Sequence, residues 1–374
     1  MSIRRAKLAR QIPIFRGGGC VKLIDVCKPK QWKTISTNEL VKDGYPVFGA
    51  NGIIGYFSDY NHEKPTLCIT CRGATCGTVN KSLPYSYVTG NSMALDDLDE
   101  SVIMIDFLYY FLQYRGFNDV ITGSAQPQIT RQSLSKIIIP DFDITIQKEI
   151  AQTIHDLEHL ILIRNKQIEK LADLVKSRFN EMFGSKKFDK VSISELVDDR
   201  IETAKKIFDQ HDTIKYIDIS SIDNKNYKMT GFQEYMLNQA PSRAQQHIRK
   251  GDIVVSTVRP NLKNIAITEL DDENLVASSG FCVLRALKCL PEYLFAIICS
   301  DRFTNKMTNI VTGANYPAIK SSDIMNYIVP LPPIQLQNEF AEFVAQVDKS
   351  QLAIQKSLEE LETLKKSLMQ EYFG

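Results

Sequence analysis

The chain has 374 residues, of which 44% are hydrophobic and 24% charged, and its formal net charge is +1. This length and composition predict a packed globular protein of two or more domains. No apolar run is long enough to span a membrane, nothing resembles a secretory signal, and the eight cysteines are scattered, so we expect a cytoplasmic protein with reduced thiols.

Residues 1–20 contain five basic residues and no acidic one, and they end in the run Gly17–Gly19. This composition predicts a flexible basic arm. Contact with phosphates and a disordered start both fit it. The triple glycine is not a phosphate-binding loop, because the Gly-Lys-Ser/Thr ending of such loops is missing.

Residues 21–146 are predicted to form the first globular domain. Short apolar runs broken by glycine and Asn-Gly, as in Tyr45–Tyr56, are typical of strands joined by tight turns. The further predicted elements are a buried strand (Thr66–Thr70), a loop (Arg72–Thr75), a turn and strand (Val88–Leu95), a helix (Ile103–Arg115), a loop rich in glycine and amides (Thr122–Thr130) and a short strand (Ile137–Pro140).

Cys68, Cys71 and Cys76 are close enough in sequence to suggest a metal site. No paired set of cysteine and histidine completes the usual ligand spacing, however. Apolar neighbours favour buried thiols, with Cys68 and Cys71 on opposite faces of a strand.

Residues 147–188 are predicted to form a long helix with a coiled-coil seam. Its apolar positions alternate by four and three residues, which is the spacing that winds one helix around another. One row runs Ile150, Leu157, Arg164, Leu171, Arg178, and the other runs Ile154, Ile161, Ile168, Val175, Met182. About 36 residues would make a rod of roughly 54 Å.

The remainder of the chain repeats this plan, as a second domain (189–336) followed by a second helix (337–374). From Thr122 and Thr312 onward the two copies align without a gap at a constant shift of 190 residues, which pairs Gln147 with Gln337. In the second domain we expect a strand at Ile214–Ile219, a strand running into a basic loop over Lys250–Asn261, a segment Ala277–Arg285 that matches Thr89–Leu95, one helix over Pro291–Asn309 and a short strand at Ile328–Pro330. The second helix carries the rows Phe340, Val347, Ile354, Leu361, Leu368 and Val344, Gln351, Leu358, Lys365, Tyr372.

The simplest partner for each long helix is the other one. The alternative is that each helix lies on its own domain. Polar seam positions such as Arg164 and Lys365 suggest a register device or contacts with further subunits.

The sequence contains no recognisable catalytic signature. Nucleotide-binding glycine motifs, the Asn/Asp-Pro-Pro-Tyr/Phe motif of amino-methyltransferases and a nuclease acidic cluster are all absent, and the histidines form no ligand pairs. Residues 21–146 contain 11 basic and 13 acidic residues, and residues 189–336 contain 17 and 18. A protein that binds DNA alone usually has a positive excess, so we expect weak DNA binding without partners.

Together these features resemble the DNA specificity subunit of type I restriction-modification systems. The resemblance lies in the Thr-Gly…Pro-x-Ile loop, the Ile-x-Ile/Val-Pro strand and the long helix that begins near Gln147 and ends at Met182-Phe183-Gly184, all present twice, and in Gly251–Pro260 and Ser278–Leu284. It implies an α+β fold in which two sister target recognition domains are separated by two helices packed as an antiparallel coiled coil with pseudo-two-fold symmetry.

The resemblance also implies a non-catalytic function. Each recognition domain would read one half of a split DNA target, and the coiled coil would set the spacer. Two modification subunits would methylate adenine with S-adenosylmethionine, and restriction subunits would use ATP and Mg²⁺, so no cofactor is expected in this chain. The alternatives are a methyltransferase or nuclease with its own recognition domains, and a coiled-coil adaptor without a nucleic-acid role.

Arginine pairs well with guanine, and asparagine or glutamine with adenine, when they extend from loops that reach a groove. On this basis we select polar loop residues in each domain as candidate DNA contacts. They are Arg72, Thr75, Asn91, Gln126, Gln128 and Arg131 in the first domain, and Arg259, Asn261, Lys263, Asn315, Tyr316 and Lys320 in the second. The two Thr-Gly pairs are expected to be structural turns.

Overall fold

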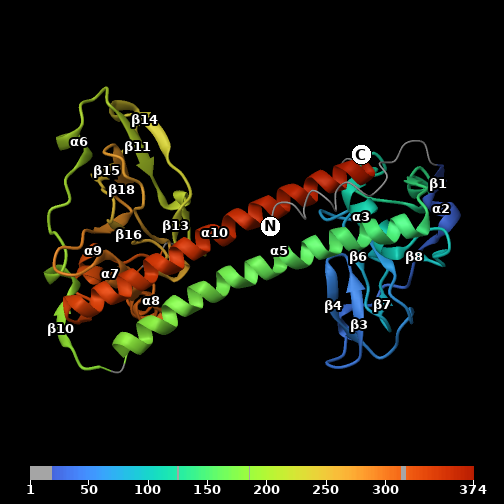
Figure 1. The fold of residues 1–374 in the computed structure, drawn as a ribbon, viewed down its shortest axis with the longest axis horizontal. Coiled ribbons are helices and arrows are strands. Elements are labelled where there is room, and N and C mark those ends of the chain that lie inside the picture. The colour runs from blue at the N-terminus through green and yellow to red at the C-terminus, as the bar shows by residue number, and fades with distance from the viewer. Residues whose placement is uncertain (1–18, 124–125, 185, 313–316) are drawn as a thin grey trace. The chain divides into compact units, whose positions relative to one another are not determined.

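The computed structural model describes residues 19–123, 126–184, 186–312 and 317–374. They form two compact units. Unit 1 comprises the described residues up to Lys166 together with Gln355–Gly374, and unit 2 comprises the described residues of Gln167–Ile354. Two long helices, α5 (Ile144–Phe179) and α10 (Ile334–Phe373), are drawn in green and red in Figure 1. Each of these helices therefore contributes to both units.

Unit 1 contains a four-stranded sheet in the order β2-β8-β5-β6 and a three-stranded sheet in the order β4-β3-β7. The inner strand β5 (Leu67–Thr70) is buried at every residue, because it is covered on both faces. The other elements are β1 (Cys20–Lys22), α2 (Leu23–Val26), β2 (Lys28–Gln31), β3 (Tyr45–Gly49), β4 (Gly52–Phe57), β6 (Val79–Lys81), β7 (Tyr87–Val88), β8 (Ser92–Asp96), α3 (Ile105–Arg115), α4 (Arg131–Leu134) and β9 (Ile138–Pro140).

Unit 2 contains a four-stranded sheet in the order β14-β11-β18-β15 and a three-stranded sheet in the order β17-β16-β19. Its inner strand β16 (Ile253–Ser256) is again fully buried. The other elements are β10 (Asp189–Ser192), α6 (Ala204–Ile207), β11 (Thr213–Ile217), β12 (Ile222–Asp223), β13 (Lys228–Met229), β14 (Gln233–Met236), β15 (Ala244–His247), β17 (Ile265–Ile267), β18 (Leu275–Ser278), β19 (Phe281–Leu284), α7 (Pro291–Ile298), α8 (Asp301–Asn309), α9 (Ser321–Met325) and β20 (Ile328–Leu331).

The segment Pro291–Asn309 is two helices, and the prediction of a single helix was wrong. The first, α7, begins with proline at its first turn, a position where the missing N–H is not needed. The break occurs at Ser300, whose side-chain oxygen accepts a hydrogen bond from the N–H of Phe303 (3.2 Å) and so caps α8.

The long helices pack against each other in both units. In unit 1, Leu157 of α5 and Leu361 and Leu368 of α10 belong to one buried cluster, which also contains the core of the β-rich part. In unit 2, Phe179 lies against Phe340 with ring centroids 5.5 Å apart. The contacts on α10 fall at lower residue numbers as those on α5 rise, so the helices run antiparallel. The long helices therefore pair with each other and also pack on the β-rich parts of the units.

Lys365, a polar residue of the predicted seam, has a bonding partner within unit 1. The ammonium of Lys365 lies 2.6 Å from a carboxylate oxygen of Glu158, and the other oxygen of Glu158 accepts a hydrogen bond from the hydroxyl of Tyr110 (3.1 Å). This pair links the two helices at a polar seam position, and its role as a register device stays a prediction.

The thiols of Cys68 and Cys71 are buried on different sides of β5. Cys68 lies in a small cluster with Phe48, and Cys71, directly after the strand, joins the main core of unit 1. Burial raises the pKa of Cys68 to about 12, so it stays a protonated thiol at neutral pH. The prediction of buried thiols on opposite faces is confirmed.

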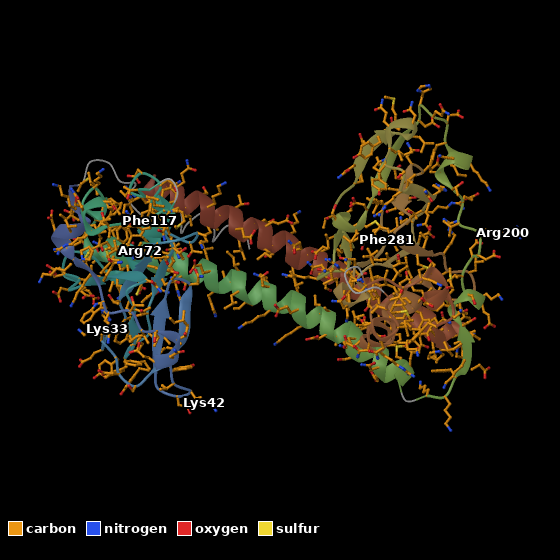
Figure 2. All side chains as sticks on the ribbon, turned by 180° about the vertical axis from the view of Figure 1, so that it is seen from behind. Lys33, Lys42, Arg72, Phe117, Arg200 and Phe281 are labelled. Carbon is orange, nitrogen blue, oxygen red and sulfur yellow. The ribbon has the colours of Figure 1, made fainter. Side chains whose placement is uncertain are left out.

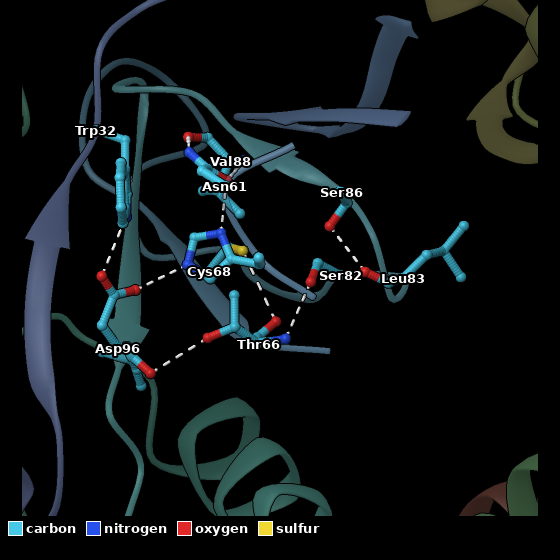
Figure 3. A network of polar contacts seen from close by, with 11 residues as sticks. Trp32, Asn61, Thr66, Cys68, Ser82, Leu83, Ser86, Val88 and Asp96 are labelled. Carbon is cyan, nitrogen blue, oxygen red and sulfur yellow. Dashed lines mark hydrogen bonds and ion pairs between the residues drawn. The ribbon is translucent and has the colours of Figure 1, made fainter. Parts of the chain in front are cut away.

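A polar network closes one corner of the unit 1 sheet, next to Cys68 (Figure 3). The carboxylate of Asp96 accepts a hydrogen bond from Nε1 of Trp32 (3.1 Å) and lies 2.8 Å from Nε2 of His62. Nδ1 of His62 lies 2.6 Å from the side-chain oxygen of Asn61, which also accepts from the N–H of Val88 (2.8 Å). The network joins Trp32, directly after β2, to β7 and β8 and thereby links the two sheets of unit 1.

Candidate nucleic-acid interface

The described ends of the two Thr-Gly loops are joined by the same backbone pairing. The N–H and C=O of Thr122 pair with those of Gln128 (2.9 Å each), and Thr312 pairs with Ala318 in the same way (3.0 Å each). Gly123 has φ +87°, and a Cβ there would lie 2.5 Å from the carbonyl oxygen of Gln126. Only glycine fits this position, so Thr122–Gly123 is a structural turn, as predicted.

In each unit the Thr-Gly loop is bonded to the loop that follows the inner strand. In unit 1 the N–H of Ile129 donates to the carbonyl of Cys71 (3.0 Å). In unit 2 the N–H of Ile319 donates to the carbonyl of Thr257 (2.9 Å). Both units therefore present two loops side by side on one frame, at the end of β5 and at the end of β16.

Three of the selected residues of unit 1 meet at one cavity of about 310 Å³. They are Arg72, which Figure 2 labels, together with Gln128 and Arg131, the first residue of α4. All three are exposed, and the backbones of Arg72 and Gln128 are paired. Two cations and an amide thus face the same solvent-filled space.

The other three selected residues of unit 1 lie beside this cavity without lining it. Asn91 is exposed, and its carbonyl accepts a hydrogen bond from the N–H of Cys71 (3.2 Å), directly before Arg72. Thr75 is exposed in the turn after Arg72, and Gln126 is exposed within the Thr-Gly loop.

Lys30 and Gln31 of β2 also line the cavity, and the sequence analysis missed both. The ammonium of Lys30 lies 3.4 Å from the centre of the Trp32 ring, a cation–π contact. The side chain of Gln31 donates to the carbonyl of Gly90 (3.1 Å). The run Lys28–Gln31 was a weak signal, because its approach to Arg72 depends on the pairing of β2 with β8, far along the chain.

The selected residues of unit 2 are less concentrated. Arg259 and Asn261 are exposed in the turn after β16, and the N–H of Arg259 donates to the carbonyl of Pro317 (2.8 Å) in the second Thr-Gly loop. Lys320 is exposed directly before α9. Asn315 and Tyr316 lie outside the described residues.

Lys263 is engaged within unit 2. Its ammonium lies 2.7 Å from the carboxylate of Asp301, and the lysine side chain is 22% exposed. Burial lowers the pKa of Lys263, but the hydrogen bonds and charges of Asp301 and Tyr227 together outweigh this effect, so the net shift is upward. Hydrogen bonds from Lys176 and Lys263 lower the pKa of Asp301 to about 2. Both groups are therefore charged at neutral pH, and Asp301 joins α5 to the turn after β16.

The chemistry of these surfaces is that of binding. They offer guanidinium, ammonium and amide donors on loops that a rigid sheet positions. Within the described ranges, no group of three or more histidine, cysteine, aspartate or glutamate side chains could hold a metal ion. None of the described helices is long and apolar enough to cross a bilayer.

Comparison with known proteins agrees with this description. The family model for the type I restriction modification DNA specificity domain matches residues 19–173 and 185–364. The chain is 25% identical over 309 residues to the specificity subunit of the type I restriction enzyme MjaVIII of Methanocaldococcus jannaschii, covering 74% of this chain and 72% of that one. It is 26% identical over 160 residues to the HindI specificity subunit of Haemophilus influenzae, covering 41% and 35%.

A solved structure shares the fold. The S subunit of the type I restriction-modification system from M. genitalium superposes with a TM-score of 0.62 at 16% identity, over 96% of each chain. This similarity supports the mixed α+β architecture with two β-rich parts and paired long helices.

Proposed function

Because the chain belongs to the family of type I restriction-modification DNA specificity subunits, we propose that it reads a DNA target made of two separated halves, one half with each unit. The paired helices α5 and α10 set the length of the spacer between the halves. The bases within the spacer are not read, so the spacer has fixed length and free sequence.

One observation carries this proposal: the two units keep the same loop frame but present different side chains on it. Where unit 1 pairs the backbones of Arg72 and Gln128, unit 2 pairs those of Val258 and Ala318. Arginine and glutamine can hydrogen-bond to base edges, whereas valine and alanine cannot. Two equivalent frames with unlike surfaces would read two unlike sequences.

We further propose that the chain is not catalytic and recruits its catalysts. Two modification subunits, which bind S-adenosylmethionine, methylate adenine, and restriction subunits supply ATP- and Mg²⁺-dependent translocation and cleavage. On the DNA side, the contacts are Arg72, Thr75, Asn91, Gln126, Gln128 and Arg131 of unit 1, and Arg259, Asn261, Lys263, Asn315, Tyr316 and Lys320 of unit 2. Lys263 is the weakest of these candidates because Asp301 already binds it.

The helix lengths test the spacer proposal. The division between the compact units falls at Lys166–Gln167 on α5 and at Ile354–Gln355 on α10. Inserting seven residues at both points would lengthen each helix by about 10 Å and keep the seam in phase. With the modification subunits present, we expect the methylated motif to keep both half-sites and to gain about two or three base pairs of spacer. The measurement is sequencing of methylated adenines on genomic DNA.

A matched control places the insertion in α5 alone. This insertion shifts α5 by one heptad against α10. We expect a less stable protein and no new methylated motif with a fixed spacer. If the double insertion changed the bases of a half-site while the spacer stayed the same, the helices would not set the spacer.

The low net charge of the chain leads to a separate prediction about the modification subunits. The chain carries a net charge of only +1, although DNA binding gains much of its affinity from neutralised phosphates. We expect the chain alone to bind a duplex containing its target at least tenfold more weakly than the complex with modification subunits, at the same salt concentration. Fluorescence anisotropy titrations of both samples measure this. Equal affinities would show that the subunits do not supply the missing phosphate contacts.

A further inference from the structure

The turn after the inner strand has the same backbone in both units but different residues. We name it the left-handed turn, Gly73–Gly77 in unit 1 and Arg259–Lys263 in unit 2. The two versions are equivalent because their first residues make the same bond: the N–H of Gly73 donates to Pro127 (3.2 Å) and the N–H of Arg259 to Pro317 (2.8 Å). Figure 2 labels Arg72, the residue directly before this turn in unit 1.

Both ends of the turn lie in the left-handed region of the backbone. Gly73 and Gly77 have φ +86° and +92°, and glycine adopts this conformation without steric cost. Arg259 and Lys263 have φ +50° and +52°, where a side chain is disfavoured. Unit 2 therefore carries two cations at positions where unit 1 shows that glycine serves the backbone better.

The contacts of Lys263 explain its presence. Its ammonium binds Asp301 (2.7 Å) and anchors the turn to the start of α8. Arg259 has no such role. Its side chain is exposed, and among the described residues its guanidinium makes no hydrogen bond or ion pair.

We infer that Arg259 is a specificity-determining residue that reads a guanine in the half-site of unit 2. This inference rests on the proposed function. Its guanidinium can form two hydrogen bonds with the O6 and N7 atoms of guanine in the major groove. In unit 1 the arginine stands one residue earlier, at Arg72, which is equivalent to Val258. The two units thus carry an arginine at adjacent positions of the same frame, directly before the turn in unit 1 and at its first residue in unit 2. The two side chains therefore leave the backbone at different places, which helps the units to read different sequences.

The test compares methylation motifs of complexes assembled with the modification subunits. For Arg259→Gly we expect one guanine of one half-site to become degenerate, with discrimination reduced about 5- to 150-fold, while the other half-site stays unchanged. The melting temperature of this variant should equal that of the wild type or exceed it by a few degrees, since glycine relieves the backbone.

Two further variants separate the alternatives. Arg259→Lys keeps the charge but lacks the planar guanidinium fork, so its preference for the same guanine should fall, though less than in Arg259→Gly. Lys263→Gly should lower the melting temperature, because it removes the bond to Asp301. If both Arg259 variants methylated the wild-type motif with unchanged preference at every position, the inference would be overturned. If Arg259→Gly weakened methylation equally for all sequences and no single base became degenerate, Arg259 would be a phosphate contact and the inference would again be wrong. If the wild-type complex produced no two-part motif, the proposed function itself would fail, a different result.

Discussion

Replacing Gln147 by leucine is expected to destabilise unit 1 by about 3 to 6 kcal/mol, enough to unfold much of it. Gln147 lies in the first turn of α5 and is fully buried. Its side-chain oxygen accepts from the N–H of Met104 (2.8 Å), and its nitrogen donates to the carbonyls of Val102 and Phe142 (2.8 Å each). Leucine has a similar volume but can make none of these three hydrogen bonds.

The second copy predicts a smaller effect at the equivalent position. Gln337 is also buried, accepts from the N–H of Leu290 (2.9 Å) and donates to the carbonyl of Pro332 (2.9 Å). With two such bonds recorded instead of three, Gln337→Leu should cost about 2 to 4 kcal/mol, in unit 2.

Denaturant unfolding, followed by hydrogen exchange of each unit, measures both effects. Gln152→Leu is the matched control on α5, because Gln152 is exposed and its side chain donates to the exposed Asp156 (2.8 Å). It should change the free energy of unfolding by less than about 0.5 kcal/mol. Equal losses of unfolding free energy in Gln147→Leu and Gln152→Leu would mean that the buried amide of Gln147 does not hold α5 to unit 1.

Gln147 and Gln337 show which features of the structure could be predicted from the sequence and which could not. The repeat aligned Gln147 with Gln337, and the spacing of apolar residues predicted the paired helices, because both signals are local or repeated. The role of the glutamines depends on backbone groups more than forty residues earlier in the chain, at Val102 and Leu290. No short-range pattern contains that information.

The candidate interface shows the same contrast between residues with a local sequence signal and residues placed by distant strands. Arg72, Gln128 and Arg131 could be selected as polar loop residues, and the structure gathers them at one cavity. Lys30 could not be selected, since its place depends on the pairing of distant strands. The engagement of Lys263 by Asp301 was equally hidden, because it depends on where α8 begins.

The corner of the sheet that Asp96 closes in unit 1 is closed by an ion pair in unit 2. Strand pairing sets Cys68 opposite Ala94 and Val254 opposite Val283, so Asp96 occupies the place of Arg285. Arg285 donates to both carboxylate oxygens of Asp252 (2.9 and 2.7 Å), and Asp252 also accepts from the N–H of Arg249 (2.8 Å). The side chains of Arg285 and Asp252 are 13% and 3% exposed, so water screens this pair little.

Replacing Asp252 by leucine is therefore expected to destabilise unit 2 by about 3 to 5 kcal/mol, because the charge of Arg285 would stay buried without its carboxylate and would keep the hydrogen bond to the carbonyl of His247 (3.3 Å). Adding Arg285→Met should recover much of that loss, since two apolar side chains can fill the space of a buried pair. The free energies of unfolding of both single variants and the double variant give the coupling directly.

The exposed pair of Lys250 and Asp271 (3.2 Å; side chains 59% and 83% exposed) is the control. Its removal by Asp271→Asn should cost at most about 1 kcal/mol, since water and salt screen it. If the double variant of Asp252 and Arg285 were as unstable as the worse single variant, the corner would need its polar bonds and not only its volume. The different polar groups at this corner of the two units, Asp96 with His62 and Arg285 with Asp252, would then be separate structural requirements of each unit and not interchangeable fillings of one scaffold.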